Sequence, residues 1–168
     1  FCGCNMMVSH DRSRPDRYPD AVEHEMEAAA RHSGAASRDV VQLHYGGGTP
    51  TFLTSQQLRR LKAALDEHFS FSDSAALGLE VDPRDCSNEQ LEVLGDLGFN
   101  RLSMGVQDFQ PQVQRAINRV QSEEETLRVV GVGRRRGMRS VNIDLIYGLP
   151  HQTAEGFADT LEKVLDIG

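Results

Sequence analysis

Four short apolar runs alternate with segments of helical pattern, and this alternation constrains the fold of the 168-residue chain more than any other feature. The runs have the length of strands and cover residues 40–45, 77–81, 102–106 and 141–147. The segments between them open with capping boxes: Thr54 with Gln57, Ser87 with Gln90, and Ser122 with Glu125. Helices are also expected over about 21–31, after the charged, Pro-containing stretch 14–19, and along Phe157, Leu161 and Val164. This alternation predicts parallel strands connected by crossover helices, in either an open doubly wound sheet or a β/α barrel.

Each predicted strand has one apolar face and one face of small or polar residues. The polar faces carry Gln42, His44 and Gly46; Gly78, Glu80 and Asp82; Ser103, Gly105 and Gln107; and Asn142 and Asp144. Parallel strands that are covered on both sides are normally apolar on both faces, and buried polar groups without partners are costly. We therefore expect the apolar faces to pack against helices and the polar faces to line a ligand-filled channel. The alternative is a sheet with one face in water.

Composition limits the possible partners and compartments. The net charge of −7 argues against nucleic acid, because phosphate backbones select basic surfaces. No apolar run approaches the ~20 residues needed to cross a bilayer. Cys2, Cys4 and Cys86 form no paired framework, so a reducing cytosol is expected. The chain starts without Met and stops directly after an apolar helical stretch, so both ends are interpreted as cuts in a longer protein.

Residues 44–50, His-Tyr-Gly-Gly-Gly-Thr-Pro, follow the first strand at the edge where β/α folds assemble their sites. Three consecutive glycines let backbone amides approach a ligand, although a purely structural turn is the alternative. The dinucleotide spacing G-x-G-x-x-G is missing. Carboxylates near neighbouring strand ends, Glu80, Asp82 and Asp144, suit an amine or ribose hydroxyls, but each is equally well explained as a structural partner of a loop. Cys2 and Cys4 are metal-ligand candidates.

In order, the segments FCGCN, GGGTP, EVDP, RLSMGVQDF, NR and NIDLIYGLP closely resemble the oxygen-independent coproporphyrinogen III oxidases of the radical S-adenosylmethionine superfamily. The resemblance covers essentially the whole chain. It implies a partial parallel β/α barrel of the radical S-adenosylmethionine type, truncated at both ends. Residues 1–168 would be one fragment of the core domain, with about four β/α units. The N-terminal cluster cysteines and the C-terminal substrate region would be missing, so the fragment alone is expected to be inactive.

The family's cluster motif is C-x-x-x-C-x-F-C-x-C, and its first three cysteines hold a [4Fe–4S] cluster. By this resemblance Cys2 is the third ligand and Cys4 the extra, non-ligating cysteine, while the first two ligands would lie two and six residues before Phe1. One thiolate cannot hold such a cluster alone. Gly47 and Glu80 would contact the cluster-bound S-adenosylmethionine. The family's contacts to a second S-adenosylmethionine map to Phe1, Gly48, Thr49, Gln107, Arg119 and Asp144.

The resemblance also implies an activity and its partners. The reaction would be radical-mediated oxidative decarboxylation of two propionates of coproporphyrinogen III to vinyl groups, giving protoporphyrinogen IX in anaerobic haem biosynthesis. The implied cofactors are the [4Fe–4S] cluster and two S-adenosylmethionine molecules. Partners would be the porphyrinogen substrate and an electron donor of the reduced flavodoxin or ferredoxin type. We expect a cytoplasmic protein, monomeric at full length, with no nucleic-acid or membrane partner.

Two alternative functions are compatible with parts of the sequence. Haem-chaperone relatives of this family bind and transfer haem, and they typically lack the last motif cysteine and the EVDP and GVQDF segments. Cys4, Asp82 and Asp108 therefore favour the oxidase. An iron-free β/α barrel that uses the glycine loop for phosphate explains GGGTP but not the cysteines, and it lacks the expected helix N-terminus or basic partner at the loop.

Overall fold

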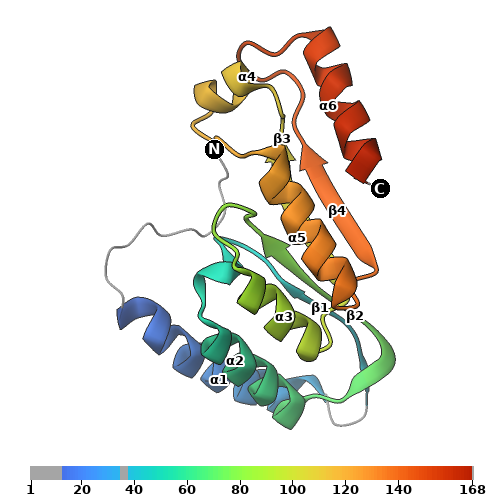
Figure 1. Cartoon of the computed structure of the whole chain (residues 1–168). Helices are drawn as coiled ribbons and strands as arrows, with labels where there is room; N and C mark the ends of the chain where they lie inside the picture. Colours follow the sequence, from blue (N-terminus) through green and yellow to red (C-terminus); the bar gives the residue numbers. More distant parts are fainter. Residues whose placement is uncertain (1–12, 35–37, 168) are drawn as a thin grey trace.

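A computed structural model describes residues 13–34 and 38–167 of the chain, which alternate between strands and helices (Figure 1). The chain order is α1 (Ser13–Ser33), β1 (Val40–Tyr45), the 3-10 helix η2 (Pro50–Phe52), α2 (Ser55–His68), β2 (Phe71–Val81), α3 (Asn88–Asp96), β3 (Arg101–Gln107), α4 (Pro111–Ala116), α5 (Glu123–Arg135), β4 (Ser140–Leu145) and α6 (Ala154–Ile167). The alternation predicted from the apolar runs is confirmed. None of the described helices is both long and apolar enough to cross a membrane.

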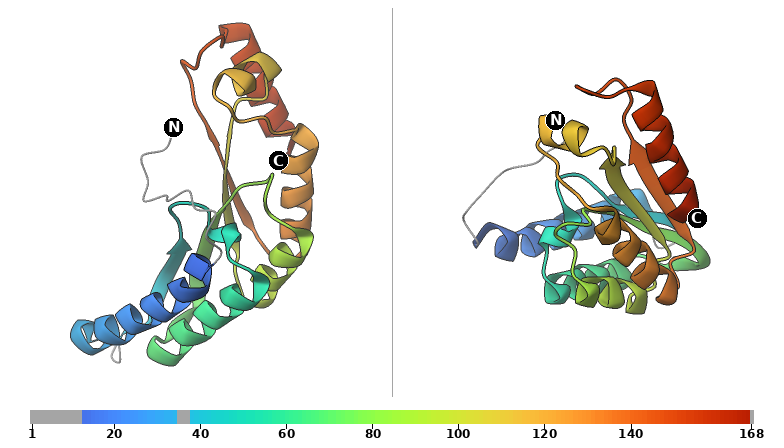
Figure 2. Two further views of the ribbon diagram at one scale, coloured as in Figure 1. Left: turned by 90° about the vertical axis from the view of Figure 1, so that its left-hand side faces the viewer. Right: turned by 45° about the horizontal axis from the view of Figure 1, so that its top comes forward.

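The four strands form one parallel sheet in the order β1-β2-β3-β4. Crossovers between parallel strands are right-handed, so connections that always step to the next strand in the same direction put every helix on the same face. Figures 1 and 2 show α2, α3, α5 and α6 together on one side of the sheet. A doubly wound sheet would reverse direction and carry helices on both faces. The arrangement is therefore that of a β/α barrel wall.

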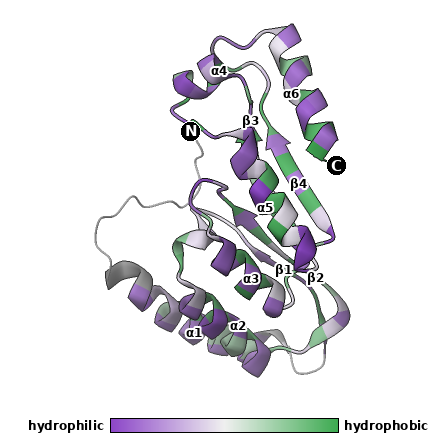
Figure 3. Ribbon diagram, in the orientation of Figure 1, coloured by the Kyte–Doolittle hydropathy of each residue, from purple (hydrophilic) through white to green (hydrophobic). Residues whose placement is uncertain are grey.

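The buried core lies between the sheet and these helices. Leu79, Leu102 and Met104 point into it from the strands and are at most 2% exposed, while Leu58 and Leu91 meet them from α2 and α3. In Figure 3 the strands and helices carry alternating hydrophobic and hydrophilic segments, as elements buried on one side should. The expected division of the strand faces is confirmed at most positions: on the opposite face Gln42, His44, Glu80, Asn142 and Asp144 are exposed. It is wrong for Val41, which is 69% exposed where the register of β1 shifts, and for Gln107, which is buried.

All three predicted capping boxes are present. In each, the hydroxyl of the N-cap residue accepts the backbone N–H of the third helical residue, whose side chain accepts the N-cap N–H in return. At the other end of α5, Gly137 adopts a left-handed φ of 92°, which ends the helix without a Cβ penalty. The capping boxes determine where α2, α3 and α5 begin. They therefore also determine the length of the loop that precedes each of these helices.

Two predicted boundaries are wrong, because tertiary contacts extend both elements. Helix α1 starts at Ser13, not near residue 21, and contains Pro19; α2 holds this first half through Gln57, which donates to Asp16. Strand β2 starts at Phe71, six residues before its apolar run. Phe71 pairs with Val40 of β1, and the side chain of Asn100 bonds the backbone of Ala75 and Leu77, so contacts with distant segments support the strand before its apolar run. The short α4 and η2 were not predicted.

Gly95 and Gly131 provide a matched test of the packing between α3 and α5. A Cβ on Gly95 would lie 2.6 Å from Cβ and 2.8 Å from the carbonyl oxygen of Arg136, whereas a Cβ on Gly131 meets nothing closer than 3.5 Å. We expect Gly95→Ala to lower the free energy of unfolding by about 1–3 kcal/mol through overpacking. Gly131→Ala should raise it by about 0.5–1 kcal/mol through helix propensity. Urea unfolding measures both, and equal effects would contradict this packing.

Candidate functional site

The glycine loop after β1 approaches a carboxylate from the neighbouring strand. Gly47 and Gly48 have φ values of 73° and 51°, a region that other residues adopt only with strain. In this conformation the Gly47 N–H donates to Oε2 of Glu80 on β2, at 3.2 Å. The loop is therefore more than a generic turn, because its backbone is directed at a half-exposed carboxylate. A half-exposed carboxylate suits a ligand that carries an amine, because it can accept hydrogen bonds from the ammonium group.

His44 lies on the same side of the sheet as this carboxylate. Its Nε2 is 3.7 Å from Oε1 of Glu80, and the two side chains are 44% and 48% exposed. A Cβ on Gly46 would come within 3.1 Å of the His44 ring and 3.3 Å of Glu80 Oε1, so glycine keeps this corner open. The exposed polar face therefore begins at β1 with an imidazole and a carboxylate in contact range.

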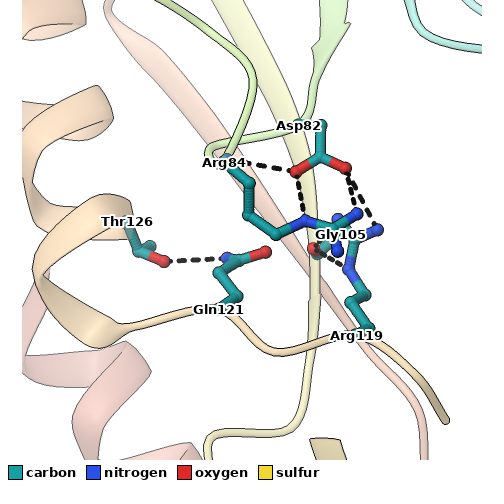
Figure 4. A network of polar contacts seen from close by, with 6 residues as sticks. All are labelled: Asp82, Arg84, Gly105, Arg119, Gln121 and Thr126. Atoms are coloured by element: carbon teal, nitrogen blue, oxygen red, sulfur yellow. Dashed lines mark hydrogen bonds and ion pairs between the residues drawn. The ribbon is translucent and has the colours of Figure 1, made fainter.

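Asp82, at the end of β2, is the centre of a charged network (Figure 4). Arg84 donates to both of its oxygens, from Nε at 2.9 Å and from Nη2 at 2.6 Å. Arg119 donates to Asp82 Oδ2 at 3.3 Å and also binds the carbonyl oxygen of Gly105 with Nε and Nη2, at 3.2 and 2.8 Å. The side chains of Asp82 and Arg119 are only 12% and 15% exposed. Arg119 is thereby held in one orientation against the end of β3.

Burial and charge act against each other in this network. Burial by itself would raise the pKa of Asp82, but the hydrogen bonds from Arg84 and the charge of Arg119 outweigh it and hold the pKa below its ordinary value of 3.8. Burial lowers the pKa of Arg119, and Asp82 opposes this effect. A guanidinium remains protonated in proteins, so the network holds two cations and one anion at neutral pH.

Gln107 ends β3 in a strained conformation. It has a left-handed φ of 68° and is 7% exposed, and a Cβ on Gly105 would lie 2.2 Å from its Nε2. The side chain of Gln107 therefore folds back over Gly105, a position that only glycine allows. A strained non-glycine residue at a strand end is typical of a functional or switch position. No pattern in the sequence indicates this conformation.

Asp144, on β4, continues the exposed polar face. Its Oδ1 accepts Nδ2 of Asn142 at 2.7 Å, and its Oδ2 lies 3.5 Å from the Ser103 hydroxyl. Thr49, the last predicted residue of the glycine loop, caps η2 through its backbone. The structure thus brings Gly47, Gly48, Thr49, Glu80, Gln107, Arg119 and Asp144 to the C-terminal ends of four adjacent strands. The predicted contacts Phe1 and Cys2, and also Cys4, lie outside the described residues.

Asp108, which the sequence analysis used only to favour the oxidase over the chaperone, has a structural role. It is fully buried, and its carboxylate accepts the N–H of Gln110 at 2.6 Å, the Thr160 hydroxyl at 3.1 Å and Nε2 of Gln152 at 2.6 Å. Gln152 in turn accepts the N–H of Gly148 at 2.6 Å. Asp108 thus ties the loop after β3 to the loop after β4 and to α6. Only three-dimensional contacts identify Gln152, because its sequence context has no distinguishing feature.

Cys86, by contrast, has no place at this edge. It is 3% exposed, and burial raises the pKa of its thiol to about 12, so it stays protonated and packs as an apolar residue. Within residues 13–34 and 38–167, no group of three or more His, Cys, Asp or Glu side chains could hold a metal ion.

The chain is similar to known proteins over nearly its whole length. The family model described as the radical SAM superfamily, where SAM is S-adenosylmethionine, matches residues 1–164. The chain is 48% identical to the oxygen-independent coproporphyrinogen III oxidase of Salmonella typhimurium and 45% identical to that of Pseudomonas aeruginosa, over 99% of this chain and 36% of each relative. It also superimposes on the solved coproporphyrinogen III oxidase (HemN) of Escherichia coli, a radical SAM enzyme, with a TM-score of 0.92 and 48% identity, covering 99% of this chain and 38% of that one.

The network around Asp82 predicts a pH-dependent contribution to stability. Because the pKa of Asp82 is lower in the folded than in the unfolded protein, its contribution is complete above about pH 4 and is lost as the pH falls through the folded pKa. We expect Asp82→Asn to reduce the free energy of unfolding by about 2–3 kcal/mol at pH 7, since it leaves two guanidinium groups without their anion. This difference from the wild type should shrink below about pH 4.

The control for this prediction is Asp159→Asn, which removes an exposed carboxylate on α6. It should leave the free energy of unfolding nearly unchanged at every pH. Denaturant titrations of the three proteins between pH 7 and pH 3 provide the comparison. An Asp82→Asn difference that stays constant down to pH 3 would contradict the depressed pKa.

Proposed function

Because this chain belongs to the radical SAM superfamily, we propose that residues 1–168 are part of the core domain of an oxygen-independent coproporphyrinogen III oxidase. Such an enzyme would decarboxylate two propionates of coproporphyrinogen III to vinyl groups and so form protoporphyrinogen IX. The observation that carries the proposal is the combination of 48% identity with a glycine loop, a carboxylate and a fixed arginine on one open polar face. The chain spans 36% of the matched relatives' length, so the complete activity belongs to the larger protein.

Membership of the superfamily implies a [4Fe–4S] cluster and S-adenosylmethionine as cofactors, which together supply a carbon radical that abstracts hydrogen from the substrate. The described residues fit the S-adenosylmethionine part. Its methionyl ammonium needs acceptors, and Glu80 presents a half-exposed carboxylate beside the open corner at Gly46. For the cluster, we propose Cys2 as one ligand, with two further cysteines upstream; Cys4 would be the non-ligating cysteine of the motif.

In this proposal Gly47 and Glu80 bind the methionyl group of the cluster-bound S-adenosylmethionine. The Gly47 N–H holds Oε2 of Glu80, so the carboxylate is oriented before a ligand arrives. Preorganised charge costs no reorganisation on binding and is therefore worth more than a mobile side chain. The apolar face and its helices exclude water from one side of the sheet, and we propose that another part of the full-length protein covers the other side.

A second S-adenosylmethionine would contact Phe1, Gly48, Thr49, Gln107, Arg119 and Asp144. The bonds of Arg119 to Asp82 and Gly105 use three of its five N–H groups, which leaves two for a carboxylate or a hydroxyl. Asp144 offers carboxylate oxygens on the exposed face of β4, where ribose hydroxyls can donate. Gln107 lies at the end of β3, where its backbone has a left-handed φ of 68°.

The remaining parts of the proposal concern the whole protein. Its partners would be the porphyrinogen substrate and an electron donor of the reduced flavodoxin or ferredoxin type, because the cluster must be reduced by one electron. We propose that it acts as a monomer in the cytoplasm. A haem-chaperone function would use the same fold, and analysis of the product separates the two functions.

The experiment that tests the function uses the full-length protein, purified and reconstituted without oxygen. The proposal predicts roughly four irons per chain. It also predicts release of carbon dioxide and formation of protoporphyrinogen IX from coproporphyrinogen III with S-adenosylmethionine and a reductant. Haem binding without decarboxylation would support the chaperone instead. A protein without iron would contradict both.

Glu80→Gln tests the cofactor site. The neutral amide loses the charge-assisted bond to the ammonium group, so we expect the dissociation constant of S-adenosylmethionine to rise about 10- to 100-fold. The iron content should not change, because Glu80 is not a cluster ligand. Glu89→Gln, at an exposed position of α3, is the matched control and should bind normally. Unchanged binding by Glu80→Gln would remove Glu80 from the site.

A further inference from the structure

The ring of His44 lies on the open polar face in a space made by two glycines. In the parallel register His44 on β1 pairs with Gly78 on β2. A Cβ on Gly78 would come within 3.2 Å of the His44 Nδ1, and one on Gly46 would come within 3.1 Å of its Nε2. Both contacts are tighter than side chains normally make. The two glycines therefore let the imidazole lie close to the sheet, with Nε2 toward Glu80.

His44 and the Gly47 amide approach Glu80 at different oxygens. The Gly47 N–H donates to Oε2 at 3.2 Å, and His44 Nε2 is 3.7 Å from Oε1. The second distance is longer than a hydrogen bond, but contacts of this kind often shorten when the ligand binds. The carboxylate is thus flanked on both oxygens while about half of its surface remains open to a ligand.

A role of His44 in the hydrophobic core does not explain these observations. Its side chain is 44% exposed and lies on the face opposite to the partly buried Leu43 and Tyr45 of β1 and the buried Leu77 and Leu79 of β2. A histidine at such a position contributes little apolar burial. The imidazole lies close to the sheet because two neighbouring positions are glycines. This close approach brings its Nε2 within contact range of the Glu80 carboxylate.

We propose that His44 is a positioning residue for Glu80: its imidazole restricts the carboxylate to the orientation that accepts the ammonium group of S-adenosylmethionine. This inference rests on the proposed function, because it assigns a support to that function's cofactor site. A half-exposed glutamate has several rotamers, and binding has to order it. Contacts at both carboxylate oxygens carry out part of this ordering in advance, so the ligand binds more tightly.

The test measures S-adenosylmethionine binding by equilibrium dialysis in the anaerobically reconstituted full-length protein, together with iron content and melting temperature. We expect His44→Ala to raise the dissociation constant about 3- to 10-fold with iron unchanged. Gly78→Ala should have a similar effect, because it keeps the imidazole but displaces it. His44→Gln, which retains an N–H of similar reach, should restore part of the affinity. His24→Ala, at an exposed position of α1, is the control.

A double-mutant cycle with Glu80→Gln separates positioning from a general structural effect. If His44 acts through Glu80, His44→Ala should cause no further loss of affinity in the Glu80→Gln background. Additive losses, or an unchanged dissociation constant in both His44→Ala and Gly78→Ala, would overturn the inference. If His44→Ala does not fold, the Gly78→Ala result decides.

Failure of the inference can be distinguished from failure of the proposed function. A wild-type protein that makes protoporphyrinogen IX, with variants that bind S-adenosylmethionine normally, contradicts only the role of His44. A wild-type protein that binds S-adenosylmethionine without decarboxylating the porphyrinogen contradicts the oxidase, while the variants still test His44. A reconstituted wild-type protein that does not bind S-adenosylmethionine contradicts both.

Discussion

The handedness of the crossovers is the constraint on which the rest of this structure depends. Four parallel strands in sequential order carry their crossover helices on one face, and the other face is then free of the helices that the structure describes. The strand faces that pack against the helices are therefore apolar, and the faces on the other side of the sheet can be polar. Glu80 on the interior strand β2, and Asn142 and Asp144 on the edge strand β4, can remain exposed because none of the described helices covers this face of the sheet.

Side-chain bonds to the backbone turn this open face into a defined surface. Gln90 binds the carbonyl oxygens of Thr51 and Leu53, and Arg128 binds those of Pro83 and Cys86, so the loops after β1 and β2 are fixed to α3 and α5. Asp108 does the same for the loops after β3 and β4. The loops at the sheet edge are therefore rigid where side chains of the candidate site begin, which is what a preorganised site requires.

The sequence predicted most of the fold, because its signals are local. Period-two patterning located the four strands and their two faces, and the capping boxes located three helix starts. The predictions from sequence failed where contacts between distant segments determine the bounds of an element. An example is the early start of α1, which is held by α2. The resemblance selected residues that lie together at the sheet edge, but not what holds them. These supporting contacts join segments that are far apart in the chain. They include the contact of His44 with Glu80, the bonds that orient Arg119 and the bond of Gln152 to Asp108.

Hydrogen exchange of the reconstituted full-length protein, with and without S-adenosylmethionine, tests the central claim that the polar face is the binding face. The account predicts that S-adenosylmethionine slows the exchange of backbone amides in the loop 46–49 and at the strand ends near Glu80 and Gln107. The outer surfaces of α2 and α3 should exchange at the same rate in both states. Protection on the helix side, or no change at the loop 46–49 in a protein that binds S-adenosylmethionine, would contradict it.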